Sequence, residues 1–445
     1  MPLFEREAQL IRENTPNEAV EENAARNFLI LGLHQILHRV GWIFKTESIV
    51  IPAFLDYIGG TPWLRGCLPM LNRFGHSVPP VLFSRRLKVM PCKKWTLVCC
   101  SVAMAVPFLI LSTIWFVIAG ERVSWLPWVF LVLYALFFTV VGVNQMAFHT
   151  LTGKLVKATR RGRLITLSTA VGAPAAILAA GLLLGPWLAR SDHGFGFIFG
   201  FTGVAFLLTS VFGMALREPA DNYEEKAGGL LEPFASALRI IRDDGDFRRL
   251  AAVAVLFSTV LVLFPHYQAM GRSHLGLHLD NLLLWVVVQN AATGLFSLLA
   301  GPVADRSGNR LVLRWVIFFS ATPPLLATAL GQADPELGRR LYWLVFFPIG
   351  LTPLTLKVLM NYTLEISAPA DHPRYVSTLS LCVAAPIIVF SPLVGLTVGL
   401  TSFEFVFITG AIVILLAGIL TYRLREPRHR LEEEDVDDTG MVVED

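Results

Sequence analysis

The stretch Gly301-Pro-Val-Ala-Asp305-Arg306-Ser-Gly308-Asn-Arg310 is a short polar segment between two long apolar runs. Leu282–Ala300 precedes it and Leu311–Leu330 follows it. Each run is about long enough to cross a hydrocarbon core of ~30 Å as a helix. The pattern therefore predicts two membrane-spanning helices joined by a tight polar turn.

Several residues of this turn have a physical use. Gly301 allows two helix ends to approach closely, and Gly308 permits a reversal with positive φ. Asp305 is suited to the positive N-terminal end of a neighbouring helix. Arg306 and Arg310 hold the turn on the cytoplasmic side of a membrane.

The composition excludes a soluble globular protein. Of 445 residues, 54% are hydrophobic and 16% are charged, and the mean hydropathy is +0.59. Soluble domains carry about 25% charged residues. The net charge of +3 comes mostly from basic loops, so nucleic-acid binding is not expected. The five cysteines show no metal-ligand spacing and no P-loop is present, so neither a metal nor a cofactor is expected.

Apolar runs of spanning length recur along the whole chain and predict an all-α polytopic membrane protein. About twelve are expected, at residues 28–55, 62–83, 96–119, 126–149, 164–188, 195–216, 249–270, 281–303, 311–332, 341–364, 376–399 and 403–423. Basic residues gather in alternate loops, which places both termini in the cytoplasm by the positive-inside rule. We expect an integral protein of the cell (inner or plasma) membrane, without a signal peptide.

The two halves of the sequence repeat. Span six ends in Leu216-Arg217-Glu218-Pro219, and span twelve ends in Leu424-Arg425-Glu426-Pro427. The expected organisation has five parts. These are a cytoplasmic segment 1–26, a six-helix bundle 27–216, a linker 217–248 with an amphipathic helix, a second bundle 249–424 and an acidic tail 425–445.

Together, the turn and the repeat resemble the major facilitator superfamily. Its signature lies between the second and third helices of each half and has the form Gly-x-x-x-Asp-Arg-x-Gly-x-Arg. The resemblance covers about residues 27–427 and implies two pseudo-symmetric six-helix bundles of twelve transmembrane helices. It also implies a gating role for Gly301, Asp305, Arg306, Gly308 and Arg310, with Arg85 in the corresponding loop of the first half.

The first half departs from this signature. Pro80 replaces the glycine and Ser84 replaces the aspartate, which puts a latch on this side in doubt. In span five, Gly172, Gly181 and Gly185-Pro186 resemble a motif of drug/proton antiporters. The alternative reading is that these small residues only allow close helix packing.

Polar residues inside the spans are the candidate substrate cavity, because ionisable groups in a membrane normally face the bundle interior or a wet cavity. The resemblance implies that spans one, four, seven and ten line that cavity. The candidates are His34, His38, Arg39, Lys45, Arg73, Asn144, Gln145, His266, Gln268, Gln289, Asn290, Lys357 and Asn361. Alternatively, Asn361 and Glu365 only cap the inner end of span ten.

The charge of these residues favours an anionic or strongly hydrogen-bonding solute, since deep cations outnumber deep carboxylates. If protons are coupled to transport, the titratable candidates are His34, His38, Glu47 and Glu365. His34 and His38 alone are too few ligands to indicate a metal.

The resemblance implies a secondary transporter that works by alternating access, as a symporter or antiporter, and not an enzyme. The expected partners are a small-molecule solute and the lipid bilayer, and the protein is expected to be a monomer. Two alternatives stay open: an efflux antiporter for amphipathic compounds, and a sensor or scaffold that keeps the fold without transporting.

Overall fold

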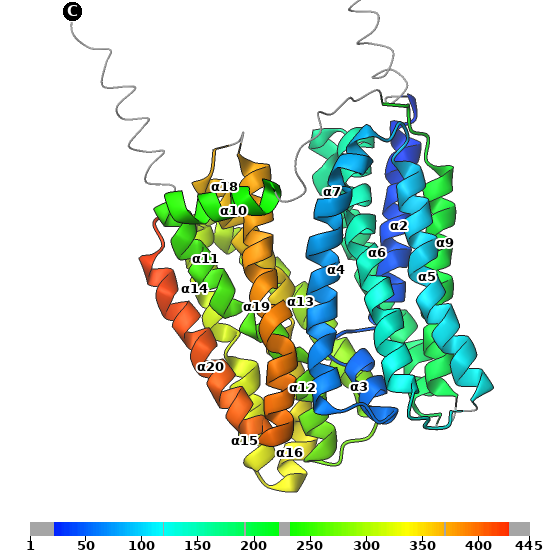
Figure 1. Ribbon diagram of the computed structural model, residues 1–445, viewed down its shortest axis with the longest axis vertical. Helices are drawn as coiled ribbons and strands as arrows, with labels where there is room; N and C mark the ends of the chain where they lie inside the picture. Colours follow the sequence, from blue (N-terminus) through cyan, green and yellow to red (C-terminus); the bar gives the residue numbers. More distant parts are fainter. Residues whose placement is uncertain (1–21, 119, 191–192, 222–231, 369–370, 427–445) are drawn as a thin grey trace, which may run out of the picture. The chain divides into compact units, whose positions relative to one another are not determined.

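The computed structural model describes residues 22–118, 120–190, 193–221, 232–368 and 371–426. Every regular element in these ranges is a helix (Figure 1). By its internal contacts the chain divides into two units. Unit 1 consists of Met1–Thr46 and Phe74–Gly228, and unit 2 consists of Glu47–Arg73 and Gly229–Asp445. The predicted halves meet at the linker, whereas residues 47–73 group with unit 2 in the structure.

The helices of the first part of the chain are α2 (Ala24–Ile43), α3 (Val50–Tyr57), α4 (Pro62–Val89), α5 (Lys94–Val117), α6 (Leu126–Leu155), α7 (Ala158–Ala179), α8 (Gly185–Leu188) and α9 (Gly194–Ala215). Those of the second part are α10 (Glu232–Asp243), α11 (Gly245–Phe257), α12 (Thr259–Ser273), α13 (Asn281–Ser307), α14 (Asn309–Phe319), α15 (Thr322–Gln332), α16 (Pro335–Leu341), α17 (Phe346–Ile349), α18 (Thr352–Ile366), α19 (His372–Leu400) and α20 (Phe403–Leu420). Two 3₁₀ turns, η2 (Tyr342–Val345) and η3 (Thr421–Arg423), lie before α17 and after α20. α10 contains the predicted amphipathic stretch of the linker.

Among the described residues, ten helical ranges are long and apolar enough to cross a membrane: Lys94–Val117, Leu126–Leu155, Arg160–Leu188, Gly194–Ala215, Gly245–Ser273, Asn281–Ala300, Asn309–Gln332, Pro335–Ile366, Arg374–Leu400 and Phe403–Arg423. They correspond to the ten predicted spans that follow the first two. The two N-terminal helices α2 and α4 have 20 and 28 residues but are more polar. At a rise of ~1.5 Å per residue, each has about the length needed to span.

The prediction of one continuous span over residues 28–55 is wrong. α2 ends at Ile43, and α3 begins only at Val50. Pro52 lies in the first turn of α3, where a residue without an N–H is best tolerated, and so favours the start of a new helix there. The second span is longer than predicted, since α4 continues to Val89 and carries Arg86 and Lys88 in its last turn rather than in a loop.

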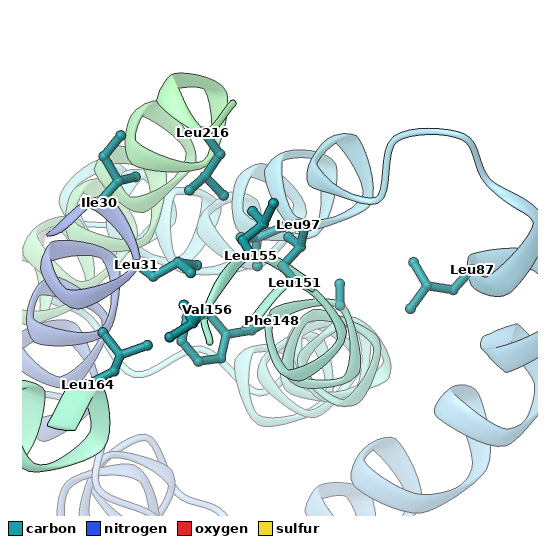
Figure 2. Packing of buried hydrophobic residues seen from close by; sticks show 11 residues of the cluster. Ile30, Leu31, Leu87, Leu97, Phe148, Leu151, Leu155, Val156, Leu164 and Leu216 are labelled. Carbon is teal, nitrogen blue, oxygen red and sulfur yellow. The ribbon is translucent and has the colours of Figure 1, made fainter. Parts of the chain in front are cut away.

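Unit 1 is built from long helices packed around an aliphatic core. α5 packs along α6 and α9, and α2 packs on α7 and α9. Gly203 allows the close approach of α9 to α5, because a Cβ there would lie 2.7 Å from Leu109 Cγ. Figure 2 shows one end of this core. Its buried residues are Ile30, Leu31, Leu87, Leu97, Ala147, Phe148, Leu151, Leu155, Val156, Leu164 and Leu216.

The end of α7 contains a π-helical turn, η1 (Ala180–Leu184), which leads directly into α8. The N–H of Gly185 bonds the carbonyl oxygen of Ala180, five residues earlier. Pro186 follows and cannot donate a backbone hydrogen bond, which favours an irregular turn at this place.

In unit 2, α11 packs on α18, α19 and α20, α14 packs on α18 and α20, and α3 packs on α12. The first part of α4 crosses α19 with backbone contact. A Cβ on Gly66 would lie 2.9 Å from Gly395 Cα, and Ser391 Oγ donates a hydrogen bond to the Gly66 carbonyl oxygen at 2.6 Å. These glycines therefore fix residues 62–73 against α19.

The repeated Leu-Arg-Glu-Pro segments hold equivalent places in the two units. In unit 1, Glu218 accepts hydrogen bonds from the backbone N–H groups of Lys93 and Lys94 at 3.0 and 2.7 Å, at the start of α5. In unit 2, Glu426 pairs with Arg310 near the start of α14, with Oε2 to Nε 3.0 Å. Glu218 thus connects the end of α9 to the start of α5, and Glu426 connects the end of α20 to the start of α14. Both α5 and α14 follow the position of the signature turn in their half of the chain.

Candidate functional site

In unit 1, α2 presents a column of rings. His34, His38 and Trp42 lie at successive i, i+4 positions, with centroids 6.2 and 5.4 Å apart and planes inclined by 17° and 22°. Phe148 of α6 continues the column at 5.5 Å from His34. The predicted helical face of His34 and His38 is therefore an aromatic stack.

Lys45 lies at the end of this column, where α2 has ended. Its side chain is fully buried, and Nζ is 2.9 Å from the Trp42 ring centroid. Phe137 and Phe138 of α6 complete a three-ring box at 4.8 and 4.7 Å. The Lys45 ammonium is therefore stabilised by aromatic faces.

His34 is 1% exposed, and neither of its ring nitrogens has a hydrogen-bond partner among the described residues. Leaving such a group unpaired costs about 1–3 kcal/mol. Arg39 is partly exposed on α2, beside α7; its Cδ is 3.4 Å from where a Cβ on Gly172 would be. The packing reading of the glycine motif thus holds at Gly172, whereas a Cβ on Gly181 would meet nothing within 4 Å.

The two α6 amides have different surroundings. Asn144 is buried and donates to Ser101 Oγ at 3.1 Å and to the Leu97 carbonyl oxygen at 3.4 Å, so it joins α6 to α5. Gln145 lies 3.4 Å from the His76 ring nitrogen, Nε2 to Nε2. The Asn144 contacts are those of a structural amide.

Unit 2 contains a buried polar cluster of four residues, Asp56, Arg65, His266 and Gln268. Arg65 Nη1 pairs with Asp56 Oδ1 at 2.6 Å, and Gln268 Nε2 donates to Asp56 Oδ2 at 2.8 Å. Arg65 Nε donates to His266 Nδ1 at 3.4 Å. Within the part of the chain that the structure describes, His266 Nε2 and Gln268 Oε1 have no hydrogen-bond partner. The cluster connects α3, α4 and α12.

The residues predicted from the sequence include His266 and Gln268 but neither Arg65 nor Asp56. One signal was available. Asp56 and Arg65 flank the turn at Gly59-Gly60, where Gly59 has φ +88°. Opposite charges on both sides of a tight helix–helix turn can meet.

Other predicted residues of unit 2 lie in separate contacts. Gln289 Oε1 accepts a hydrogen bond from Ser48 Oγ at 2.7 Å, and Asn290 Nδ2 donates to the backbone of its own helix, α13. Arg73 is partly buried, and the negative charge of Glu47 acts on it. Glu47, which lies outside span two, is thus an acidic residue whose charge acts on Arg73.

Lys357 and Asn361 are exposed on one side of α18, one helical turn apart. Glu365 is exposed one turn further and accepts a hydrogen bond from Asn309 Nδ2 at 2.7 Å. A lysine on a spanning helix is costly in lipid. This side of α18 is therefore the clearest candidate for a surface that faces water.

The signature turn agrees in part with its predicted geometry. Gly308 has φ +82°, which confirms the predicted reversal, and it precedes α14. Arg310 Nη1 also donates to the Leu424 carbonyl oxygen at 3.3 Å, and Arg306 is exposed. The surroundings of Gly301, Asp305 and Arg85 lie outside the part of the chain that the structure describes.

Apolar spanning helices that carry buried and exposed charges define a polytopic membrane protein with a transporter fold. A sequence model of the Major Facilitator Superfamily matches residues 272–440. The part of the chain from residue 272 to residue 440 is therefore similar to this superfamily in sequence. A comparison with curated proteins finds no match.

Solved structures share the fold at low sequence identity. The nucleoside transporter NupG has a TM-score of 0.66 at 12% identity, covering 89% of this chain and 98% of its own. The peptide transporter POT in complex with sulfate has a TM-score of 0.63 at 13% identity, covering 91% and 98%. A bacterial homolog of the human lysosomal transporter Spinster, inward-facing and occupied, has a TM-score of 0.63 at 12% identity, covering 90% and 96%.

Proposed function

We propose that this protein is a secondary active transporter that moves a small polar or anionic solute across the membrane by alternating access. One observation carries the proposal. Lys357 and Asn361 are exposed on a spanning helix, where lipid contact would be costly. A water-filled solute path past α18 accounts for both residues.

The distribution of charge supports the substrate class. Lys45 is enclosed by rings, and Arg65 is paired with Asp56. Among the residues that the structure describes, Arg39 and Lys357 have no ion-pair partner and are at least partly exposed. Cations of this kind suit a carboxylate, a phosphate or another strong hydrogen-bond acceptor. The fold neighbours named above include a nucleoside and a peptide transporter, both for polar solutes.

Coupling to protons belongs to the same proposal. His34, His38, Glu47 and Glu365 are the titratable candidates. Glu365 is exposed on the same side of α18 as Lys357, so a proton there would change the local charge. A second function, efflux of amphipathic compounds, is favoured by the ring column of His38 and Trp42, since both side chains are partly exposed.

The test is flux into proteoliposomes that contain the purified protein. Radiolabelled nucleosides, dipeptides, organic acids and phosphate would be compared, with and without an imposed pH gradient. We expect accumulation of one class, and a loss of about tenfold or more in Lys357→Ala and Arg39→Gln, because a charge-assisted contact to the solute is removed.

Arg242→Gln is the matched control, since Arg242 is an exposed cation on α10, outside the spans. Wild-type flux in both Lys357→Ala and Arg39→Gln would contradict a role of these cations in solute binding. Absence of flux for all solutes, including amphipathic dyes, would favour the sensor alternative.

A further inference from the structure

One end of unit 2 has an open cavity of about 720 Å³ that no transport role accounts for. α10 forms one wall, and the starts of α11 and α19 form others; α10 packs on both helices (Figure 1). The lining residues are Ser236, Arg239, Ile240, Asp243, Asp244, Gly245, Asp246, Arg249, Arg374, Tyr375 and Arg425.

Two of the three lining aspartates are already engaged. Asp244 caps α11 by accepting from the N–H groups of Asp246 and Phe247, and it also accepts from Tyr375 Oη at 2.7 Å. Asp246 pairs with Arg249 at 2.9 Å and with Arg425 at 3.4 Å. Asp244 and Asp246 therefore have donors of their own. The lining carries four arginines and three aspartates, so its net formal charge is +1.

Two lining arginines are left with capacity for an anion. Arg239, on α10, is exposed and donates only to the backbone carbonyl of Ala235. Arg374, at the start of α19, is 71% exposed and reaches Asp371 at 3.7 Å. Their guanidinium groups come from different helices, so one polyanionic segment could be bound by both.

The chain itself supplies such a segment. The described part of the chain ends at Glu426, directly after Arg425, which lines the cavity. The acidic residues that follow are Glu432, Glu433, Glu434, Asp435, Asp437 and Asp438. Glu432 comes six residues after Glu426 in the sequence, a reach of up to about 20 Å. A tethered ligand within that reach has an effective concentration of about millimolar order.

We propose that the acidic tail segment 432–438 binds in this cavity as an intramolecular ligand. Its carboxylates pair with Arg239 and Arg374, and thereby connect the linker helix α10 to α19. Docking of the tail restrains the ends of α10, α11 and α19 and so regulates the protein. The contact is electrostatic, so salt releases it: raising the ionic strength from about 0.1 M to about 1 M shortens the Debye length from about 10 Å to about 3 Å.

Disulfide cross-linking in the full-length protein tests this proposal. With the five native cysteines replaced by serine, Val436→Cys is combined with Ser236→Cys, which lines the cavity. The matched control combines Val436→Cys with Leu238→Cys, because Leu238 is on the same helix, outside the cavity lining, and 69% exposed. We expect the Ser236 pair to form a disulfide about tenfold faster than the control pair.

The difference in disulfide formation rate between the two pairs should disappear under three conditions. These are replacement of the six acidic residues of the tail by glutamine and asparagine, the double variant Arg239→Gln/Arg374→Gln, and high salt. A synthetic peptide of residues 428–445 in excess should slow the reaction. Equal rates for the two pairs, or rates that ignore tail charge and salt, would overturn the proposal. Neither result depends on solute flux, so this proposal and the proposed transport can fail separately.

Discussion

At the scale of single residues, the buried charges divide into satisfied and unsatisfied groups. Lys45 and Arg65 are both deep cations, but rings enclose the first and a carboxylate holds the second. Arg39 and Lys357 are partly or fully exposed. Of these four cations, only Arg39 and Lys357 are at least partly exposed, although all four carry the same formal charge.

Lys45→Met should lower thermal stability. The substitution keeps the length of the side chain but removes the attraction of the ammonium to three rings, worth about 1–2 kcal/mol in a desolvated site. Thermal unfolding of the purified protein in detergent measures the change. Lys357→Met is the matched control, because Lys357 is exposed and this substitution should leave the unfolding midpoint unchanged. Equal midpoints for the two variants would contradict a stabilising role of the three rings around Lys45.

Asp56→Asn and Arg65→Gln should each destabilise the protein strongly. Removing one partner of a buried ion pair leaves the other uncompensated, at a cost of about 3–5 kcal/mol. The Arg65 side chain is 7% exposed, so water cannot replace the lost partner. A double-mutant cycle of unfolding free energies should show that the two losses are not additive. Additive losses would mean that the pair is not coupled.

At the scale of elements, carboxylates after the last long helix of unit 1 organise the start of α5. Glu218 accepts from two backbone N–H groups there and from Lys154 Nζ at 2.8 Å. Asp221 pairs with Lys93, and with Lys154 at 2.9 Å. Charged contacts thus hold the three segments together at this junction.

The stability of this junction should depend on pH. Partial burial opposes ionisation of Asp221, but the hydrogen bonds and charges of Lys93 and Lys154 outweigh it and hold its pKa below the ordinary value of 3.8. Because the folded-state pKa is depressed, the contribution to stability is fully present above about pH 4 and is lost as the pH falls through the folded-state pKa.

Asp221→Asn should remove this part of the acid dependence, measured as thermal midpoints between about pH 3 and pH 7. Glu336→Gln, at an exposed site on α16, is the control and should retain it. An unchanged pH profile in Asp221→Asn would exclude the junction as its source.

At the scale of the whole molecule, the chain does not divide where its sequence repeat suggests. Residues 47–73 come early in the sequence but group with unit 2, through the Gly66–Gly395 crossing and the Asp56 cluster. Residues 47–73 therefore belong to the first half by sequence but to unit 2 by their contacts.

Gly395→Leu should loosen residues 47–73 selectively. A side chain at this position would meet the Pro62 carbonyl oxygen at 2.5 Å from its Cβ. Hydrogen exchange should become faster in α3 and the first half of α4 than in α5 and α6, by about tenfold for each 1.4 kcal/mol lost. Gly181→Leu, where a Cβ has free space, should leave α3 unaffected. Uniform acceleration along the chain would argue against the selective effect.

The fold could be predicted from sequence because spanning length, loop charge and the Gly308 turn are local signals. The signature and the repeat carry the resemblance to the superfamily, and the family model matches residues 272–440. The site could be predicted only in part. Spacing on a helix placed His34 beside His38. The Asp56–Arg65 pair, however, contacts Gln268 and His266 across 212 and 201 positions of sequence, which no local pattern reveals.

The π-helical turn at Ala180–Leu184 has a geometric consequence for the residues beyond it. One extra residue in a turn rotates everything downstream by about 100° around the helix axis. Trp187 consequently meets Phe44 and Phe201, with centroids 5.9 Å away in both cases. Without that inserted residue, the indole would swing away from these phenyl groups, so a local irregularity selects which neighbours the far end of the helix acquires.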